Sequence, residues 1–124
     1  MRPTLVLGFL AAFAAAVTID ASVHADPTPP QPTFAVSGGS ITVTAQGNTH
    51  VNNQFPWYVK DGTGTKVKQL TDFAFTGGST AAPTIAAVKG APATGTLRGG
   101  YCQDTGCYTF TASCTASSCT ITGT

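Results

Sequence analysis

Two pairs of cysteines near the end of the chain carry the clearest signs of chemistry. Cys102 and Cys107 have four residues between them, and the same spacing recurs twelve residues later at Cys114 and Cys119. The residues inside the pairs favour tight turns, and β-prone runs follow both pairs. Residues that face each other across an antiparallel hairpin lie within the Cα range of a disulfide. Of the three possible connectivities, we therefore predict Cys102–Cys107 and Cys114–Cys119.

Bridges between such near neighbours contribute modestly to stability. Closing a six-residue loop restricts the unfolded chain by about 2 kcal/mol, whereas a Cys102–Cys119 bridge, with its longer loop, would contribute about 3 kcal/mol. Short bridges that are exposed or strained are also more easily reduced, so the pairs are either structural bridges or a redox-active site. A zinc site is a third interpretation, but zinc cysteines usually occur as C-x2–4-C, a limit that this spacing only just meets. We expect no metal and no cofactor.

The first 25 residues have the pattern of a secretory signal peptide. Arg2 gives a positive start, Leu5–Val17 is an uncharged apolar run, and Val23-His24-Ala25 places small residues before a cleavage site. The apolar run is shorter than the roughly 20 residues that span a bilayer, so we expect cleavage and no membrane insertion, with an uncleaved anchor as the alternative. The exported chain, Asp26–Thr124, would be periplasmic or secreted, where oxidising conditions favour disulfides.

Composition argues against two broad classes of protein. The 124 residues carry a formal net charge of +1 and only 9% charged side chains, and every acidic residue is an Asp. Nucleic-acid binding relies on clustered Lys and Arg, so no nucleic-acid partner is expected. Charged helix formers are scarce while Thr, Gly, Ala and Val are abundant, which disfavours a helical bundle.

Beyond the signal peptide, the pattern predicts a single all-β domain. Residues 26–33 contain four prolines, which predicts an extended leader. Short β-branched or aromatic runs then alternate with turn residues at intervals of about 8–12 residues, which is typical of an antiparallel sandwich. We predict an immunoglobulin-like antiparallel β-sandwich over residues 34–124. Its strands are expected at residues 34–36, 41–44, 57–59, 67–70, 73–75, 84–88, 94–97, 108–112 and 120–122.

Other residues are weaker candidates for a functional site. His50 is the sole histidine after the predicted cleavage, and since no nucleophile motif accompanies it, we expect a structural or surface role. The run Phe55-Pro56-Trp57-Tyr58 is expected to fill the core, with an exposed binding strip as the alternative. Asp61-Gly62-Thr63-Gly64 predicts a hairpin turn rather than a calcium loop.

The segment His50–Trp57 resembles a family signature. Its sequence, HVNNQFPW, is similar to the H-[VLI]-N-x-x-[FY]-P-[aromatic] pattern of small exported domains related to the N-terminal domain of the thiol:disulfide interchange protein DsbD. In that family a glycine-containing strand leads to a cysteine pair, as Gly95–Cys102 does here, and Tyr108 matches the tyrosine after the second cysteine. The resemblance implies an immunoglobulin-like sandwich in the periplasm.

The same resemblance implies a redox role for one cysteine pair. In redox-active members the pair passes electrons from a membrane partner to soluble thiol oxidoreductases, and its counterpart here is Cys102 and Cys107. This pair encloses four residues instead of the family's five, and Tyr108-Thr109-Phe110 stands where the family has Tyr-Pro-Pro. Cys114 and Cys119 are an alternative match to the family pair.

Two functions from different classes are compatible with these patterns. The first is a non-enzymatic exported domain, stapled by two disulfides, that acts as a binding or structural module of the cell envelope with another exported or envelope protein as partner. The second is a thiol–disulfide exchange carrier that uses Cys102 and Cys107 and has a thiol oxidoreductase as partner. Arg98 is the nearest cation in the sequence that could favour a thiolate there. The pattern leaves enzymatic activity an open question.

Overall fold

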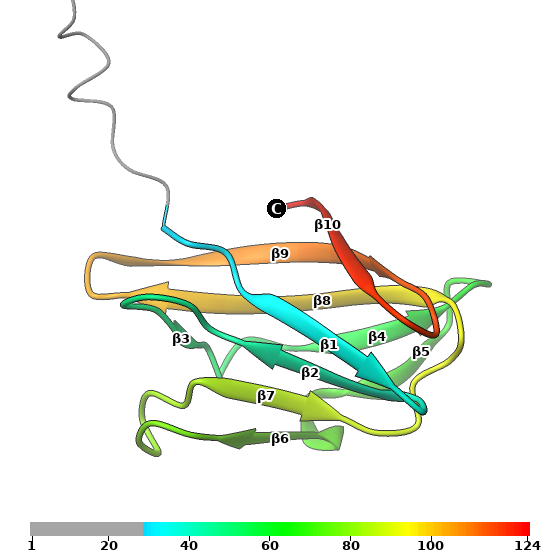
Figure 1. Cartoon of the computed structure of the whole chain (residues 1–124), viewed down its shortest axis with the longest axis horizontal. Helices are drawn as coiled ribbons and strands as arrows, with labels where there is room; N and C mark the ends of the chain where they lie inside the picture. The colour runs from blue at the N-terminus through cyan, green and yellow to red at the C-terminus, as the bar shows by residue number, and fades with distance from the viewer. Residues whose placement is uncertain (1–28) are drawn as a thin grey trace, which may run out of the picture.

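The computed structural model describes residues 29–124, in which ten short strands form two antiparallel sheets (Figure 1). The first sheet has the order β1-β2-β7-β6, and the second has the order β10-β9-β8-β4-β5, with β3 paired to β8 beside β4. The strands are β1 (Thr33–Ser37), β2 (Ser40–Thr44), β3 (His50–Val51), β4 (Tyr58–Asp61), β5 (Lys66–Gln69), β6 (Phe73–Thr76), β7 (Ile85–Val88), β8 (Gly95–Gln103), β9 (Gly106–Cys114) and β10 (Cys119–Gly123). One short 3-10 helix, η3 (Leu70–Asp72), connects β5 to β6.

The order of the strands is that of an immunoglobulin-like sandwich. Such folds pair strands A-B-E-D in one sheet and C-F-G in the other, with C′ added beside C in larger members. Here β1-β2-β7-β6 corresponds to A-B-E-D, and β5-β4-β8-β9 corresponds to C′-C-F-G. The last strand, β10, extends the second sheet beyond β9. The predicted all-β sandwich is therefore confirmed.

Trp57 lies at the centre of the core that joins the two sheets. Its side chain is 1% exposed, and its ring centroid lies 5.4 Å from that of Phe73, 5.8 Å from that of Phe75 and 5.7 Å from that of Phe110. Phe73 and Phe75 belong to the first sheet and Phe110 to the second. Because aromatic rings contribute most of the buried apolar surface in so small a core, this cluster fixes the packing of the two sheets.

The hairpin of β8 and β9 is longer than the sequence predicts. Each strand has nine residues, and they pair without a break as far as Gln103 and Gly106, so Asp104-Thr105 closes the hairpin in place of the expected four-residue loop. Glycine has a low strand propensity, and for this reason Gly99 and Gly100 were not predicted as strand residues. Strand β3 was not predicted because its two residues show no pattern of their own.

The start of the described region packs against the domain. Pro29 and Pro32 are buried, and β1 begins at Thr33, the last residue of the predicted leader. The predicted signal peptide, residues 1–25, lies outside the described residues. Within residues 29–124, no helix is long and apolar enough to cross a membrane.

Candidate redox site

Both predicted disulfides are present, each across a hairpin. Cys102 on β8 is bonded to Cys107 on β9, and Cys114 on β9 is bonded to Cys119 on β10. In each bridge the Cα atoms are 4.0 Å apart and the cysteines are direct partners in the strand register. The predicted pairing is therefore confirmed, and neither bridge connects one sheet to the other.

The two bridges lie on opposite faces of the second sheet. Successive side chains of a strand point to alternate faces, and Cys107 and Cys114 are an odd number of positions apart on β9. Cys114 is 3% exposed and belongs to the hydrophobic core, against which Cys119 packs. Cys102 and Cys107 thus point to the outer face of the sheet, away from the first sheet. The second bridge is part of the core, and the first is part of a surface.

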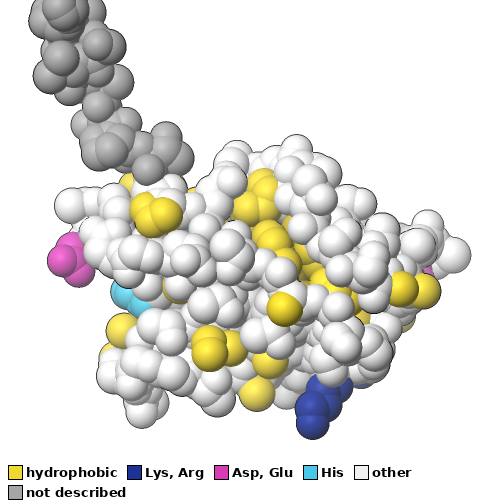
Figure 2. All heavy atoms as spheres, viewed as in Figure 1, with side chains coloured by type: hydrophobic (Ala, Val, Ile, Leu, Met, Phe, Trp, Pro, Cys, Tyr) yellow, Lys and Arg dark blue, Asp and Glu magenta, His cyan; other side chains and the backbone are white. Residues whose placement is uncertain are grey.

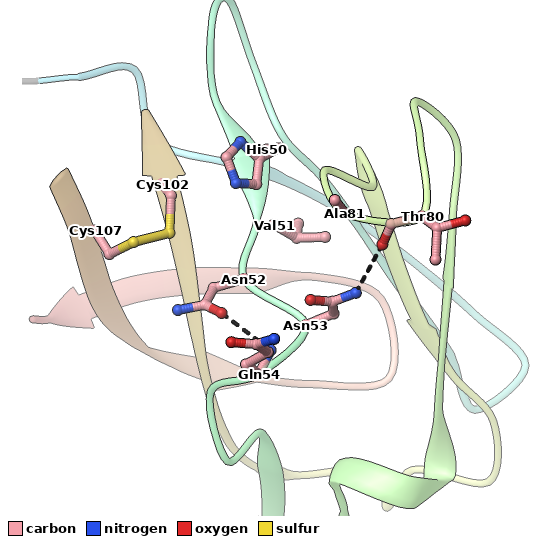
Figure 3. Close-up of a pocket in the computed structure, with 9 residues that line it drawn as sticks. All are labelled: His50, Val51, Asn52, Asn53, Gln54, Thr80, Ala81, Cys102 and Cys107. Carbon is pink, nitrogen blue, oxygen red and sulfur yellow. Dashed lines mark hydrogen bonds between the residues drawn. A yellow bond between two sulfur atoms is a disulfide. The ribbon is translucent and has the colours of Figure 1, made fainter. Parts of the chain in front are cut away.

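A cavity of about 580 Å³ opens beside the outer bridge (Figure 3). The two cysteines differ in exposure: Cys107 is exposed, whereas Cys102 is only 6% exposed. The cavity is lined by both cysteines, by the β3 segment and by the loop between β6 and β7, with these residues: His50, Val51, Asn52, Asn53, Gln54, Thr80, Ala81, Cys102 and Cys107. The predicted redox pair therefore lies in a hollow that a ligand can enter.

His50 is the direct neighbour of the outer bridge. Strand β3 pairs His50 with Cys102 across the ladder, and residues paired in this way point to the same face. Figure 3 shows the imidazole and the Cys102 sulfur on the same side of β3 and β8. The sequence predicted only a structural or surface role for His50, because its strand was not recognised. An imidazole in this place can exchange a proton with a thiol or balance the charge of a thiolate.

Hydrogen bonds hold the segment that frames the cavity. The Asn52 N–H donates to the Gly100 carbonyl on β8 at 2.9 Å, and the Asn52 carbonyl accepts a bond from the Trp57 indole nitrogen at 2.6 Å. The Asn52 side chain accepts a bond from the Gln54 N–H at 3.0 Å, and the Asn53 amide donates to the Thr80 carbonyl at 3.1 Å. The segment is thus held to β8 through the Asn52 backbone and to the loop between β6 and β7 through the Asn53 amide.

Two glycines on β8 let the aromatic rings of the same segment lie on both faces of the sheet. A Cβ atom on Gly99 would lie 2.5 Å from the Trp57 ring on the core side, and a Cβ on Gly100 would lie 3.3 Å from the Phe55 ring on the outer side. The aromatic run was expected to fill the core. That holds for Trp57, whereas Phe55 and Tyr58 are half-buried on the outer face.

Arg98 lies on the same outer face, further along β8. Its guanidinium donates hydrogen bonds to the hydroxyls of Thr111 at 2.7 Å and Thr109 at 3.3 Å, and its Cζ lies 5.8 Å from the centre of the Phe55 ring. Thr109 is two residues from Cys107 on β9. The cation that the sequence singled out is therefore anchored on the outer face between the aromatic ring and the strand that carries Cys107.

The inner side of the same ladder is a tyrosine pair. Tyr101 stacks on Tyr108 with a centroid distance of 5.7 Å. Burial, followed by the neighbouring Tyr108, raises the pKa of Tyr101, so this phenol stays neutral next to the redox pair at ordinary pH. Among residues 29–124, no group of three or more His, Cys, Asp or Glu side chains is placed to hold a metal ion.

Comparison with known proteins adds no assignment to this geometry. No family model matches the chain, and no curated protein or solved structure matches it either. The strand order alone identifies the fold, and the residues around the Cys102–Cys107 bridge alone indicate the chemistry of the site.

Proposed function

We propose that this chain is an exported immunoglobulin-like carrier that performs thiol–disulfide exchange at Cys102 and Cys107, in the periplasm or outside the cell. One observation supports the proposal most directly: this bridge lies on the outer face beside a cavity and includes the exposed residue Cys107, while Cys114 of the other bridge is buried in the core and Cys119 packs against it. Exposed bridges exchange more readily than buried ones. The resemblance of His50–Trp57 to domains of the DsbD N-terminal kind supports the same function.

The direction of the exchange follows from the unequal exposure of the two cysteines. A thiolate of a partner protein attacks the sulfur of the exposed Cys107 and forms a mixed disulfide, and the electron pair of the broken bond leaves on Cys102 as a thiolate beside His50. A second thiol of the partner then attacks the partner's own sulfur in the mixed disulfide and releases Cys107 as a thiolate. The partner dithiol is oxidised, and Cys102 and Cys107 are reduced.

The hairpin is built to survive reduction. Tyr101 pairs with Tyr108 before the bridge and Gln103 pairs with Gly106 after it, so the ladder continues on both sides. On its other edge, β8 is held by β3. Losing one covalent bond in a paired hairpin therefore leaves the strands in place.

The experiment is to measure the reduction potential of each bridge by thiol trapping and mass spectrometry of the purified protein across glutathione buffers. We expect Cys102–Cys107 to be reduced reversibly at roughly −230 to −120 mV, the range of known carriers, and Cys114–Cys119 to stay closed. If both bridges stay closed below roughly −300 mV, they are structural staples and the proposed exchange is wrong.

A second candidate function is a binding or structural module of the cell envelope, and the amide-lined cavity favours it. Asn52, Asn53 and Gln54 can pair with the main chain of a bound protein segment without any redox step. A Cys102→Ser/Cys107→Ser variant separates the two candidates. Undiminished partner capture by this variant would support the binding module, whereas loss of all partner capture by the folded variant supports the carrier.

A further inference from the structure

We infer that the protein partner presents an acidic segment next to its cysteine, and that this segment lies on a basic face beside the outer bridge. The basic face consists of Phe55, Tyr58, Lys60, Lys66 and Arg98 on the outer side of β4, β5 and β8. The inference rests on the proposed exchange at Cys102–Cys107 and names the chemistry of its partner.

The strand register places the basic face and the bridge on one surface. Arg98 and Cys102 are an even number of positions apart on β8, so both point to the outer face. Tyr58 is the partner of Arg98 in the ladder, and Lys60 is the partner of both Thr96 and Lys66. The outer face therefore carries a disulfide at one end and cations at the other.

Aromatic rings hold these cations on the surface. The Lys66 and Lys60 ammonium groups lie 4.6 Å and 5.3 Å from the centre of the Tyr58 ring, and Arg98 lies over Phe55. A cation over a ring keeps its outward N–H groups free for an anion. Three of the five Lys and Arg residues within residues 29–124 are thus gathered on this face.

The carboxylates of Asp61, at the end of β4, and of Asp72, just after β5, accept local hydrogen bonds. Asp61 accepts bonds from Thr63 and Thr65 within its own turn, and Asp72 accepts a bond from the Gln69 N–H at 2.8 Å. The opposite face differs, since in Figure 2, where β1 and β2 face the viewer, charged side chains lie only at the rim. Charge complementarity therefore favours an anionic ligand on the outer face of the second sheet.

The length of the surface fits an extended peptide. Along a strand of about 3.3 Å per residue, Arg98 lies about 13 Å from Cys102 and the level of Lys60 about 20 Å from it. A bound segment whose cysteine reaches Cys107 would thus bring residues roughly four to six positions away over the cations. A protein with a thiol and acidic residues at that distance can therefore react with the bridge and bind the cations at the same time.

The test uses the purified protein and three thiols: glutathione, a peptide with one cysteine and a run of aspartates four to six residues away, and the same peptide with lysines in place of the aspartates. The readout is the initial rate at which the Cys102–Cys107 bridge opens, trapped by alkylation. At low ionic strength we expect the acidic peptide to react about tenfold faster than the basic peptide, and at about 1 M salt, where screening is strong, at nearly the same rate.

Charge variants locate the effect. Lys60→Gln/Lys66→Gln is expected to reduce the preference for the acidic peptide over the basic peptide to about threefold or less. Lys89→Gln is the matched control, because Lys89 is an exposed lysine that follows β7 of the other sheet, and it should keep the preference.

Each outcome decides a different claim. Equal rates for the two peptides, with normal opening by glutathione, overturn the acidic partner and leave the exchange intact. Failure of all three thiols to open the bridge overturns the exchange itself. Co-sedimentation with phosphatidylglycerol vesicles that is lost in Lys60→Gln/Lys66→Gln, without any peptide preference, would make the face a membrane surface and also overturn the inference.

Discussion

At the scale of single residues, the roles of Cys102 and Cys107 differ because their strands differ in position. Cys102 lies on β8, which has β9 on one side and β3 on the other, and it is 6% exposed. Cys107 lies on β9 near the closed end of the hairpin, at a level that the paired part of β10 does not reach, and is exposed. In the proposed exchange, the incoming thiolate therefore attacks Cys107, and the negative charge released on Cys102 lies beside His50.

We predict that His50→Leu raises the pKa of the Cys102 thiol in a chain that also carries Cys107→Ser, because the imidazole can donate a hydrogen bond to a neighbouring thiolate. The thiolate is followed by its ultraviolet absorbance as a function of pH. Equal melting temperatures of the Cys107→Ser protein with and without the substitution at His50 exclude a general loss of structure. An unchanged pKa of the Cys102 thiol would contradict the role given to His50.

Gly99 and Gly100 allow a matched pair of substitutions. A methyl group on Gly99 would lie 2.5 Å from the buried Trp57 ring, whereas a methyl group on Gly100 would lie 3.2 Å from the Tyr108 carbonyl oxygen and 3.3 Å from the Phe55 ring, contacts that a much smaller shift relieves. We expect Gly99→Ala to lower the free energy of unfolding by about 2–3 kcal/mol and Gly100→Ala by less than about 1 kcal/mol. Urea unfolding measures both, and equal losses would show that the Trp57 contact is not the cause.

At the scale of elements, the β4–β5 hairpin depends on a single carboxylate. The Thr63 hydroxyl, followed by the Thr65 N–H, donates to Asp61 and holds the pKa of Asp61 below its usual value. A pKa lowered by folding adds stability above the unfolded-state pKa, and that stability is lost as the pH falls through the folded-state pKa.

We therefore expect Asp61→Asn to melt a few degrees below the unsubstituted protein at neutral pH. The difference should disappear in acid, well below the ordinary aspartate pKa of about 3.9, where both side chains are neutral. Thermal unfolding followed by circular dichroism across this range measures the difference. A difference in melting temperature that persists in acid would mean that the shape of the turn, and not the charge of Asp61, causes the effect.

The sequence predicts where the strands lie along the chain better than it predicts which strands pair with one another. Alternating β-branched residues predicted most strands, and cysteine spacing predicted both bridges. The β8–β9 hairpin was predicted too short, because the benefit of Gly99-Gly100 comes from rings elsewhere in the chain. The contact between His50 and Cys102 depends on the pairing of distant strands, which local patterns do not encode.

At the scale of the whole molecule, the sheets are joined by packing and not by a covalent link. Each disulfide connects neighbouring strands of the second sheet, while Trp57 contacts both Phe73 of the first sheet and Phe110 of the second. The two bridges close loops of equal length. Any difference between the stability lost on removing one bridge and on removing the other therefore reflects packing alone.

We predict that removing the inner bridge destabilises the protein more than removing the outer one. Each pair of Cys→Ala changes gives up about 2 kcal/mol of loop restriction, and only Cys114→Ala/Cys119→Ala also leaves a gap in the core. Urea unfolding of this variant and of Cys102→Ala/Cys107→Ala compares them directly. Equal losses would mean that Cys114 contributes no packing.

The small span of the bridges has a mechanical consequence. Each bridge joins residues only five positions apart. When the two ends of the chain are pulled, a closed bridge therefore keeps only a very short loop from being extended. Opening one would lengthen the stretched chain by only about 14 Å. Resistance to pulling therefore resides in the hydrogen-bonded ladders, and a change of redox state leaves the extensibility of the molecule almost unaltered.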